Sequence, residues 1–549
     1  MSGFGSVVRH GRGWLPVIGV AALAGSLVAL ALPSVLGRAV DAIVAGSSVG
    51  GWLALAGGLI AVAVVCDLVD AFADTACVAG TTAWLRHRLV RRVVAGGPEG
   101  SRPYESGDLV SRVSGDAADA ARAGPAAVAA LAAVIPPVGS LVLLILIDPW
   151  LAVAFVAGVA LVIAVLWLFT LRTTELSQAY AETQGRLAAL LSETLAGIRT
   201  VAAAGTLDRE QRRILRPLRT LHRHGLLTWD VLARSGAQAA IVGPLILVAV
   251  LAVGGVRLTG GVISPGDLFA AAQYAVLGAG LGGLTGMFGE LARSRAGIRR
   301  TDAVLAIAPL GHGTRTLGPG SGRLQFRGVG VTAGGADRLA ELDLDLPGSA
   351  RVAVVGPSGS GKSLLAALAA RLRDPDTGRI LLDGVPLAEL SRSELRRAVG
   401  CAFERPALFG RTVEESILVG RTEPAAATVA AAANAHAFVS RLPEGYRTPL
   451  AVAPLSGGEA QRLGLARAWP AGRLLVLDDA TSSLDSMTEA QIGRSLLAAD
   501  DRRTRLIVTH RLGTAARADL VVWLESGRLR GFGRHDQLWS DPAYRQVFG

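Results

Sequence analysis

Apolar residues are concentrated in the first 300 positions of the chain, in long stretches without a charged side chain. A helix needs about 20 residues to cross a bilayer, and six stretches reach or approach this length, the second of them running on into charged residues. They are residues 14–37, 51–66, 123–147, 149–171, 235–256 and 268–289. The pattern predicts a short cytoplasmic N-terminal segment (residues 1–12) followed by a six-helix transmembrane domain (residues 13–300).

The connections between the predicted spans differ in length and charge. Two long ones, near residues 73–122 and 172–234, are rich in arginine, whereas the short connections on the opposite side carry only Arg38 and Arg257. Arginine collects on the cytoplasmic side of membrane proteins, so we expect both long loops in the cytoplasm and the chain in the cell membrane. Apolar residues alternate with arginine at helical spacing in these loops, which predicts helices that continue beyond the bilayer.

The formal net charge of +11 is of a kind that nucleic-acid-binding proteins often carry. Here the excess arginine lies mainly in the loops next to the predicted spans, so we expect no nucleic-acid partner. The three cysteines, Cys66, Cys77 and Cys401, do not have the spacing of a metal site. Cys66 and Cys77 lie on one predicted helix, about 16 Å apart along its axis, which is too far for a disulfide.

The second half of the chain has a different pattern. A glycine-rich stretch near residues 310–323 interrupts the helical periodicity, so we expect a linker over residues 301–322 and a second domain over residues 323–549. Short apolar runs then alternate with helical segments; they are RLQFRGV, ARVAVV, GRLLVLDD, TRLIVTH and ADLVVWLE. This alternation predicts an α/β domain with a largely parallel sheet.

One segment of this domain fits a phosphate-binding loop. The sequence GPSGSGKS follows the apolar run RVAVV and precedes LLAALAARL, which is the strand–loop–helix context that the pattern G-x-x-x-x-G-K-[ST] requires. The predicted nucleotide-binding residues are Gly356, Pro357, Ser358, Gly359, Ser360, Gly361, Lys362, Ser363 and Leu364. Backbone N–H groups of such a loop converge on phosphate oxygens, and the Ser363 hydroxyl suits Mg²⁺.

Lys362 is the only lysine in a chain that has 55 lysines and arginines in total. A lysine ammonium is a compact point charge, whereas the guanidinium of arginine is a broad, planar fork. We therefore expect Lys362 to hold the terminal phosphates at a place inside the loop where arginine does not fit.

Three later segments carry candidate chemistry. The segment LSGGE precedes a predicted helix and offers a second anion site at its N-terminus. This second site consists of Ser456, Gly457, Gly458 and Glu459. At the end of an apolar run, Asp478 suits the Mg²⁺ shell and Asp479 can polarise water; His510 ends another run. Taken singly, these are an ordinary loop, two solvated turn residues and a structural histidine.

Taken together, the order and spacing of these segments resemble the ATP-binding cassette (ABC) exporters, in which a membrane domain is fused ahead of a nucleotide-binding domain. LSGGE is similar to the family signature, DDATSSLD to its Walker B and D-loop segments, and His510 to its switch histidine. In the membrane half, ESGDLVSRVSGD, ETLAGIRTVAAAG and ISPGDLFAA resemble the two inner-loop signatures and the approach to the sixth span.

This resemblance implies an α-helical six-span transmembrane domain followed by an α/β P-loop ABC ATPase domain. It also implies that the chain is half of a dimer in which the phosphate loop of one half and the signature of the other enclose each ATP. ATP and Mg²⁺ are the implied ligands, and short coupling helices are implied at residues 107–114 and 205–210.

The chain departs from the family pattern at several positions. Asp479 stands where the family has a catalytic glutamate, Glu404 where it has a glutamine near Mg²⁺, Ala333 where it has an aromatic residue against adenine, and Glu459 where the signature ends in glutamine. The first three lie on the phosphate-loop side, and we assign Asp479, His510 and Glu404 as the catalytic candidates. Glu404 also remains a candidate for the metal, together with Ser363 and Asp478.

These departures favour a degenerate-site subunit that pairs with a different chain in a heterodimeric exporter. A homodimer with slow ATP hydrolysis is the main alternative, and an ATP-gated regulatory membrane protein without transport is another. The expected substrate is an amphipathic small molecule or a peptide. Asp67, Asp70 and Asp74 share one face of the second span; they line a vestibule for cations or, as we favour, pair with arginines or mark the cytoplasmic exit.

Overall fold

The computed structural model describes residues 3–279, 282–333, 335–497 and 502–549. The chain divides into two compact units, which we call the helical unit and the sheet unit. The helical unit contains Met1–Arg91 and Ser106–Ala306, and the sheet unit contains Arg92–Glu105 and Ile307–Gly549. The sheet unit therefore includes a short segment from the first half of the sequence.

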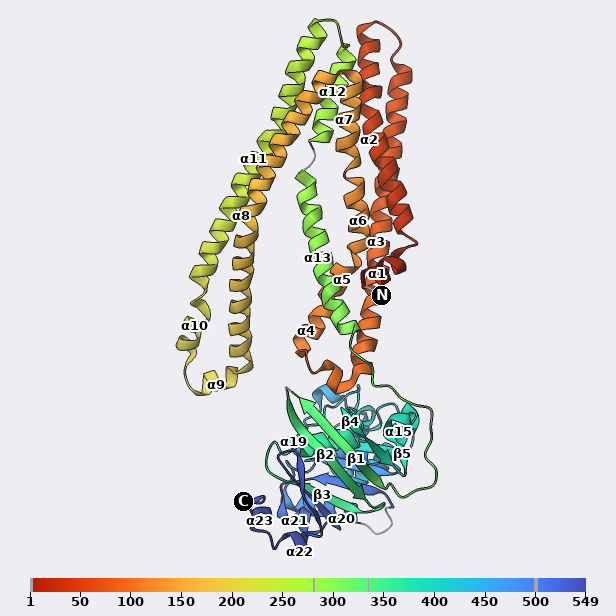
Figure 1. Cartoon of the computed structure of the whole chain (residues 1–549), viewed down its shortest axis with the longest axis vertical. Helices are drawn as coiled ribbons and strands as arrows, with labels where there is room; N and C mark the ends of the chain where they lie inside the picture. The colour runs from red at the N-terminus through yellow and green to blue at the C-terminus, as the bar shows by residue number, and fades with distance from the viewer. Residues whose placement is uncertain (1–2, 280–281, 334, 498–501) are drawn as a thin grey trace. The chain divides into compact units, whose positions relative to one another are not determined.

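The helical unit is built from long helices (Figure 1). Its helices are α1 (Gly3–Gly11), α2 (Leu15–Val44), α3 (Gly50–Ser101), α4 (Ser106–Ser111), the π-helical turn η1 (Arg112–Asp116), α5 (Ala117–Ala121), α6 (Ala123–Ala132), α7 (Ile135–Ile147), α8 (Pro149–Ala196), α9 (Ile198–Ala203), α10 (Leu207–Leu215), α11 (Leu218–Thr259), α12 (Pro265–Gly278) and α13 (Gly282–Leu305). The helix α3 continues into the sheet unit.

The predicted apolar stretches lie on these helices. In the described residues, three helical regions are long and apolar enough to cross a membrane: Leu15–Val44, Gly50–Ser101 and Ser106–Ile147. Two shorter apolar regions, Pro149–Ala160 and Gly243–Thr259, belong to α8 and α11. The sixth predicted stretch falls on α12 and α13, and residues 280–281 between them lie outside the described part.

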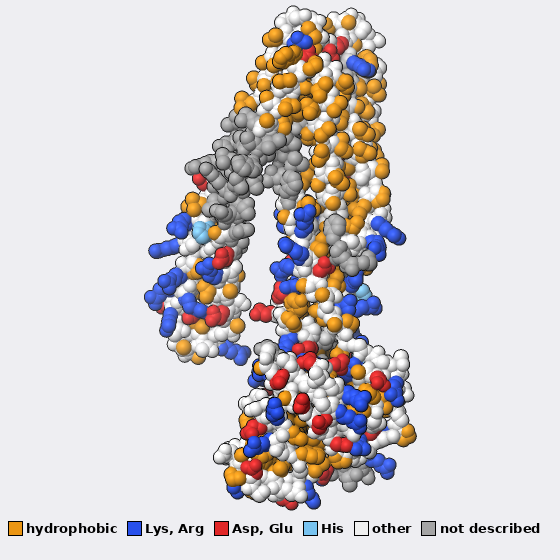
Figure 2. Space-filling model, in the orientation of Figure 1, with side chains coloured by type: hydrophobic (Ala, Val, Ile, Leu, Met, Phe, Trp, Pro, Cys, Tyr) orange, Lys and Arg blue, Asp and Glu red, His pale blue; other side chains and the backbone are white. Residues whose placement is uncertain are grey.

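Side chains at the helix ends hold neighbouring helices together. Asp41 of α2 accepts hydrogen bonds from Ser264 Oγ and from the backbone N–H of Gly266, each at 2.7 Å, so α2 is tied to the start of α12. Asp148, which caps α8, pairs with Arg257 of α11 at 2.6 Å. Much of the outward surface between these ends is apolar (Figure 2), as expected for helices that face lipid.

The sheet unit contains two sheets. The larger has the order β10-β9-β3-β8-β7-β6; its strands β3, β6, β7, β8 and β9 run parallel, and β10 is antiparallel to β9. These strands are β3 (Arg351–Val355), β6 (Val399–Phe403), β7 (Leu474–Asp478), β8 (Thr504–Val508), β9 (Leu520–Glu525) and β10 (Arg528–Gly533). The largely parallel sheet expected from the sequence is confirmed.

The smaller sheet is antiparallel and has the order β2-β1-β4-β5. Its strands are β1 (Leu324–Ala333), β2 (Ala336–Leu346), β4 (Thr377–Leu382) and β5 (Val385–Pro386). One buried core joins both sheets and packs around α14, while a second lies beneath α19. The helices of the unit are α14 (Lys362–Ala369), α15 (Arg392–Ala398), α16 (Val413–Leu418), α17 (Ala426–Ala432), α18 (His436–Val439), α19 (Gly457–Ala468), α20 (Ser486–Leu497), α21 (Leu512–Ala516), α22 (His535–Leu538) and α23 (Pro542–Gln546).

The end of α3 is part of the sheet unit. The helix changes direction at Gly97, whose φ is +63° and which is followed by Pro98. Beyond Arg91, the carbonyl of Ala95 accepts a hydrogen bond from the backbone N–H of Leu310 at 3.1 Å. Glu99 pairs with Arg373 at 3.3 Å. This part of α3 is therefore fastened to the segment that follows α13.

Candidate nucleotide-binding site

The predicted phosphate loop connects β3 to α14 at the carboxyl edge of the larger sheet. Gly356, Gly359 and Gly361 have φ angles of +149°, +81° and +101°, a region that favours glycine. A Cβ atom at Gly356 would also clash with the carbonyl oxygen of Leu524. Gly361 precedes α14 without a side-chain cap, so the first N–H groups of that helix remain available to an anion.

Two buried polar side chains point to a ligand in this loop. Lys362 is only 6% exposed, and its ammonium donates to the carbonyls of Gly356 at 2.8 Å and of Pro357 at 2.9 Å. Burial lowers the pKa of Lys362, although the charges of Asp479 and Asp478 act in the opposite direction. The buried Ser360 Oγ has no hydrogen-bond partner among the described residues, which is uncommon for a buried hydroxyl.

The two aspartates lie at the same edge, where β7 ends. Asp478 accepts a hydrogen bond from Ser363 Oγ at 2.9 Å. Asp479 has a φ of +49°, and its Oδ2 lies 3.7 Å from Nε2 of His510. The pKa of each aspartate is raised, mainly by burial and in part by Glu404. Hydroxyl and carboxylate oxygens are the ligands that Mg²⁺ prefers, so Ser363 and Asp478 fit a metal site.

Glu404, predicted to lie near the metal, follows β6 at this edge. Its side chain is 55% exposed and forms an ion pair of 3.9 Å with Arg405. Its charge still acts on Asp478 and Asp479, as their raised pKa values indicate. The backbone carbonyl of Glu404 is more firmly held, because it accepts a hydrogen bond from Gln461 Nε2 at 2.7 Å.

The predicted signature segment forms the N-terminus of α19. Ser456 Oγ accepts from the backbone N–H of Glu459 at 3.3 Å, and the Glu459 carboxylate accepts from the backbone N–H and the hydroxyl of Ser456 at 2.8 and 2.7 Å. This reciprocal arrangement is a capping box. Gly457 and Gly458 form the first turn of the helix. The carboxylate at position 459 thus occupies the helix end that was predicted to receive an anion.

Sequence reasoning missed Gln461, which connects three segments of the site. Its side chain is 2% exposed; it donates to Ser482 Oγ at 3.0 Å as well as to Glu404, and it accepts from the backbone N–H of Ser483 at 3.0 Å. The signal was available, because Gln461 is a polar residue in the buried stripe of α19, and buried amides need partners. Arg511, next to His510, also binds this segment and donates to the carbonyl of Ser482 at 3.1 Å.

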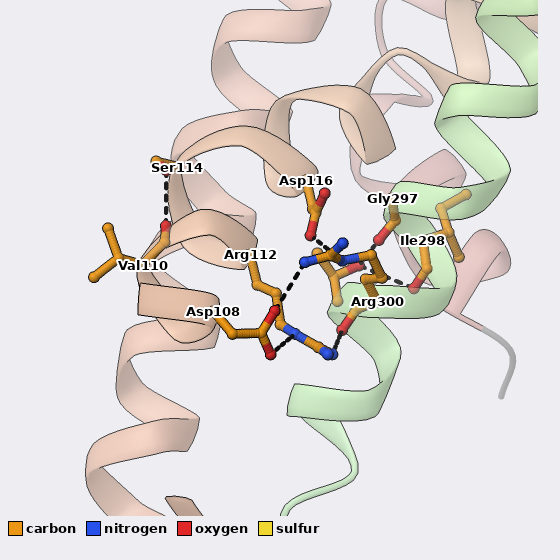
Figure 3. A network of polar contacts seen from close by, with 9 residues as sticks. Asp108, Val110, Arg112, Ser114, Asp116, Gly297, Ile298 and Arg300 are labelled. Atoms are coloured by element: carbon orange, nitrogen blue, oxygen red, sulfur yellow. Dashed lines mark hydrogen bonds and ion pairs between the residues drawn. The ribbon is translucent and has the colours of Figure 1, made fainter. Parts of the chain in front are cut away.

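The predicted first coupling segment, residues 107–114, lies in the helical unit (Figure 3). Arg300 of α13 pairs with Asp108 of α4 at 2.8 Å and with Asp116 of η1 at 2.6 Å. Arg112 pairs with Asp108 at 2.8 Å and donates to the carbonyl of Arg300 at 2.8 Å. The segment is therefore fixed to α13 by charge. The second predicted segment, residues 205–210, begins at the turn between α9 and α10.

The acidic face of α3 is only partly buried. Asp67 is exposed, whereas Asp70 and Asp74 are half-buried. In the described residues none of the three forms an ion pair, and Arg122 pairs instead with Glu290 at 3.4 Å. Pairing with arginines, one of the two interpretations that the sequence favoured, is therefore not found within the described part of the chain; the other, that they mark the cytoplasmic exit, stays a prediction.

Two family models match the chain. The model of the ABC transporter transmembrane region matches residues 15–278, and the model described as ABC transporter matches residues 339–482. The chain belongs to the ABC transporter family and is an exporter half-transporter: a transmembrane helical domain is followed by a P-loop ATPase domain that is coupled to transport. Membership implies ATP binding, a multi-pass location in a membrane and assembly as a dimer.

Two similar proteins and one solved structure support the assignment to the ABC exporters. The ABC transporter ATP-binding protein RamA of Streptomyces coelicolor is 44% identical over 98% of this chain and 86% of its own length. A multidrug efflux ATP-binding/permease protein of Mycobacterium tuberculosis is 32% identical over 99% of this chain and 46% of its own length. The structure of a bacterial Atm1-family ABC exporter with ATP bound matches with a TM-score of 0.77 and 26% identity, over 98% of both chains.

Proposed function

We propose that this chain is the degenerate-site subunit of a heterodimeric ABC exporter. Its own phosphate-loop site binds ATP and hydrolyses it slowly, while its signature segment completes a second site on a different partner chain. Ser363 and Asp478 would hold Mg²⁺, which supplies a Lewis acid for phosphoryl oxygens. Lys362 and the N-terminus of α14 hold the phosphates.

The observation that carries this proposal is the carboxylate at position 479. It directly follows the metal candidate Asp478, and it lies 3.7 Å from His510, which supports its assignment as the base that activates water. An aspartate is one methylene shorter than the glutamate of the family pattern. Displacing a catalytic group by about 1 Å can cost roughly 100-fold in rate.

The charge of the site supports the same conclusion. The charges of Asp478 and Asp479 act on Lys362. Glu404 adds a third carboxylate, which together with burial raises the pKa of both aspartates. A neutral amide at position 404 would not oppose the negative charge of the phosphates. The carboxylate at that position weakens nucleotide binding and leaves less attraction for the transition state.

The test is ATP hydrolysis by the purified chain in lipid, comparing wild type with Asp479→Glu. We expect slow wild-type turnover and an increase of about 100-fold in the variant. Asp479→Asn, which keeps the size of the side chain and removes the base, is the matched control and should not accelerate hydrolysis. If Asp479→Glu is as slow as wild type, the short side chain is not the cause and the proposal fails.

One observation favours the homodimer as the second candidate. One edge of the sheet carries all of the residues needed for phosphate and Mg²⁺ binding and the histidine: Lys362, Ser363, Asp478 and His510. Ser363 Oγ also donates a hydrogen bond to Asp478. Brisk hydrolysis by the wild-type chain alone, unchanged in Asp479→Glu, would establish that the chain works with a second copy of itself. We propose further that the ATPase domain is cytoplasmic, because the arginine-rich loops precede it on the same side.

The proposed substrate is an amphipathic small molecule or a peptide that leaves through the lipid membrane. The name of the mycobacterial relative, a multidrug efflux protein, supports an amphipathic substrate. Uptake of labelled amphiphiles into inverted vesicles that contain the chain and its partner would test this. Uptake that does not depend on ATP would contradict it.

A further inference from the structure

Two basic segments that are far apart in the sequence meet in the helical unit. The end of α1 packs on α3, where the carbonyl of Gly11 lies 3.9 Å from the thiol of Cys77. About two turns farther along α3, the ring of His10 stacks on Trp84, with ring centres 4.6 Å apart and planes inclined by 11°. This packing brings two arginines from the end of α1 and the turn that follows it toward two arginines of α3 that precede its bend at Gly97. We call them the basic patch: Arg9, Arg12, Arg88 and Arg91.

The arginines of the basic patch are available to a ligand. All four are exposed, and within the described residues none of them forms an ion pair. Arg88 lies over the ring of Trp84 at 5.3 Å, which orients it without neutralising its charge. Guanidinium groups bind phosphate oxygens through paired N–H donors. The patch therefore offers an unneutralised site for a phosphate group.

An apolar groove of about 410 Å³ lies between α2 and α3, farther from the arginines. It is lined only by apolar side chains, among them Val17, Val20 and Ala24 of α2 and Val65 and Val69 of α3. Val20 is 68% exposed and Val65 is 58% exposed. Figure 2 shows that the visible surface of the long helices is rich in apolar side chains.

An aromatic pair separates the groove from the basic patch. Trp14 and Phe72 meet edge to face, with ring centres 6.0 Å apart, and tryptophan favours the boundary between hydrocarbon and headgroups. Along α2, about 14 Å of helix rise separates Ala24 from Leu15, the first residue of the helix, and Arg12 lies in the turn just before it. This span is comparable to the length of one lipid, because half of a bilayer hydrocarbon core measures about 15 Å and the headgroup lies beyond it.

The acidic residues of α3 point away from the groove. Successive residues of a helix are turned by about 100°, so Val65, Val69 and Phe72 share one face of α3. By the same rule, Asp67, Asp70 and Asp74 point in roughly the opposite direction. Counted in the same way, Arg88 lies on the side of Asp70, about 140° around the helix from Val65. Arg12, four residues before Pro16 of the groove wall, is therefore the arginine of the patch that is next to the groove.

We propose that the groove and the basic patch together form a binding site for one anionic phospholipid of the cytoplasmic leaflet. Its phosphate lies at Arg12, while Arg9 and Arg88 add positive charge farther along α1 and α3, and an acyl chain fills the groove between α2 and α3. The Trp14–Phe72 pair lies at the level of the glycerol backbone. This site is built from α1, α2 and α3 of this chain and includes none of the nucleotide-binding residues.

The test uses the full chain purified in a neutral detergent. Dioleoylphosphatidylglycerol or dioleoylphosphatidylcholine is titrated in mixed micelles, and bound lipids are counted by native mass spectrometry. Wild type should retain one phosphatidylglycerol with an affinity at least about tenfold above that for phosphatidylcholine. The triple variant Arg9→Gln, Arg12→Gln, Arg88→Gln should lose this preference.

Two controls separate a site from general attraction. The triple variant Arg186→Gln, Arg216→Gln, Arg219→Gln removes the same charge from exposed positions elsewhere and should keep the preference. Ala24→Phe fills the groove and should lower retention of both lipids. Equal binding of the two lipids by wild type, equal loss in the two triple variants, or unchanged retention in Ala24→Phe would each overturn the proposal.

Discussion

The helices α14 and α19 of the sheet unit both begin at a predicted anion site, but their N-termini are completed differently. Before α14, Gly361 supplies no side-chain cap, and only Lys362 reaches back to the loop. Before α19, Ser456 and Glu459 satisfy each other in a capping box. The first end leaves its N–H groups to a ligand, whereas the second is already occupied by a carboxylate of its own chain.

The difference teaches that a small-residue segment before a helix does not by itself define an equally strong anion site. At α14 a ligand adds hydrogen bonds that the protein lacks. At α19 an approaching phosphate meets the negative charge of Glu459 first. The phosphate-loop side carries most of the departures from the family pattern. We propose that Glu459 weakens the signature side as well, and variants on both sides can test this.

The largest effect is expected at Lys362. Its ammonium lies within 2.9 Å of two loop carbonyls and is nearly buried, so a guanidinium cannot take the same place. Lys362→Arg should therefore lower ATP affinity by about 10- to 100-fold, as much as Lys362→Ala. Equilibrium binding of a fluorescent ATP analogue to the purified chain measures this. Binding by Lys362→Arg at the wild-type level would show that charge alone suffices.

A smaller effect is expected at Gln461, which links α19 to the two segments near the phosphate loop. In Gln461→Glu a carboxylate oxygen would face the carbonyl of Glu404, so a hydrogen bond becomes a repulsion. We expect a loss of about 1–3 kcal/mol in the free energy of unfolding, together with slower ATP hydrolysis. Denaturant titration measures the first. The exposed Gln546→Glu is the control, and equal losses in both variants would contradict a linking role.

A modest gain is expected when Glu459 is replaced. Glu459→Gln removes negative charge from the N-terminus of α19, and a charge at a helix end is worth about 0.3–1 kcal/mol. The ATP concentration for half-maximal hydrolysis, measured in the Asp479→Glu background, should therefore fall by about two- to fivefold. Glu444→Gln removes an exposed charge elsewhere and should leave it unchanged. An unaltered value in Glu459→Gln would mean that the carboxylate does not hinder the phosphate.

The smallest effect concerns the pH dependence of the capping box. Burial acts to raise the pKa of Glu459, but hydrogen bonds from Ser456, helped by the charges of Arg462 and Arg441, outweigh it, and the pKa lies below its usual value. A carboxyl of this kind adds stability above its unfolded-state pKa and loses it as the pH falls through the folded-state pKa.

Wild type should therefore be more stable than Glu459→Gln by a few tenths of a kcal/mol near pH 7. The difference should shrink as the pH falls below about 4. Thermal unfolding of both chains across this range measures it, and a difference that persists at pH 3 would rule out the charge of Glu459 as its origin.

The parts of the molecule that the sequence predicted are those where local pattern is sufficient. The phosphate loop is recognisable because strand, glycines, lysine and helix are adjacent in the chain. The apolar stretches are recognisable because a membrane span needs a long uninterrupted run. Asp478 was predictable as the last residue of a strand.

The remaining features depend on residues that meet only after folding. The linking role of Gln461 depends on its hydrogen bonds to Glu404 and Ser482, which lie on other segments of the chain. The basic patch exists because α1 packs on α3. That Glu459 caps the N-terminus of α19 could be seen only from the side-chain geometry, because the sequence LSGGE is also compatible with an uncapped helix N-terminus.

The end of α3 has a consequence for how the protein is made. Residues 92–105 leave the ribosome long before Leu310 and Arg373, with which this segment will form contacts. Until those residues are synthesised, the segment has nothing to bind. Until the segment binds, Leu310 and Arg373 of the sheet unit lack these contacts. Folding of the sheet unit therefore requires residues from both halves of the sequence. A fragment that starts at residue 307 would lack residues 92–105, which belong to this unit.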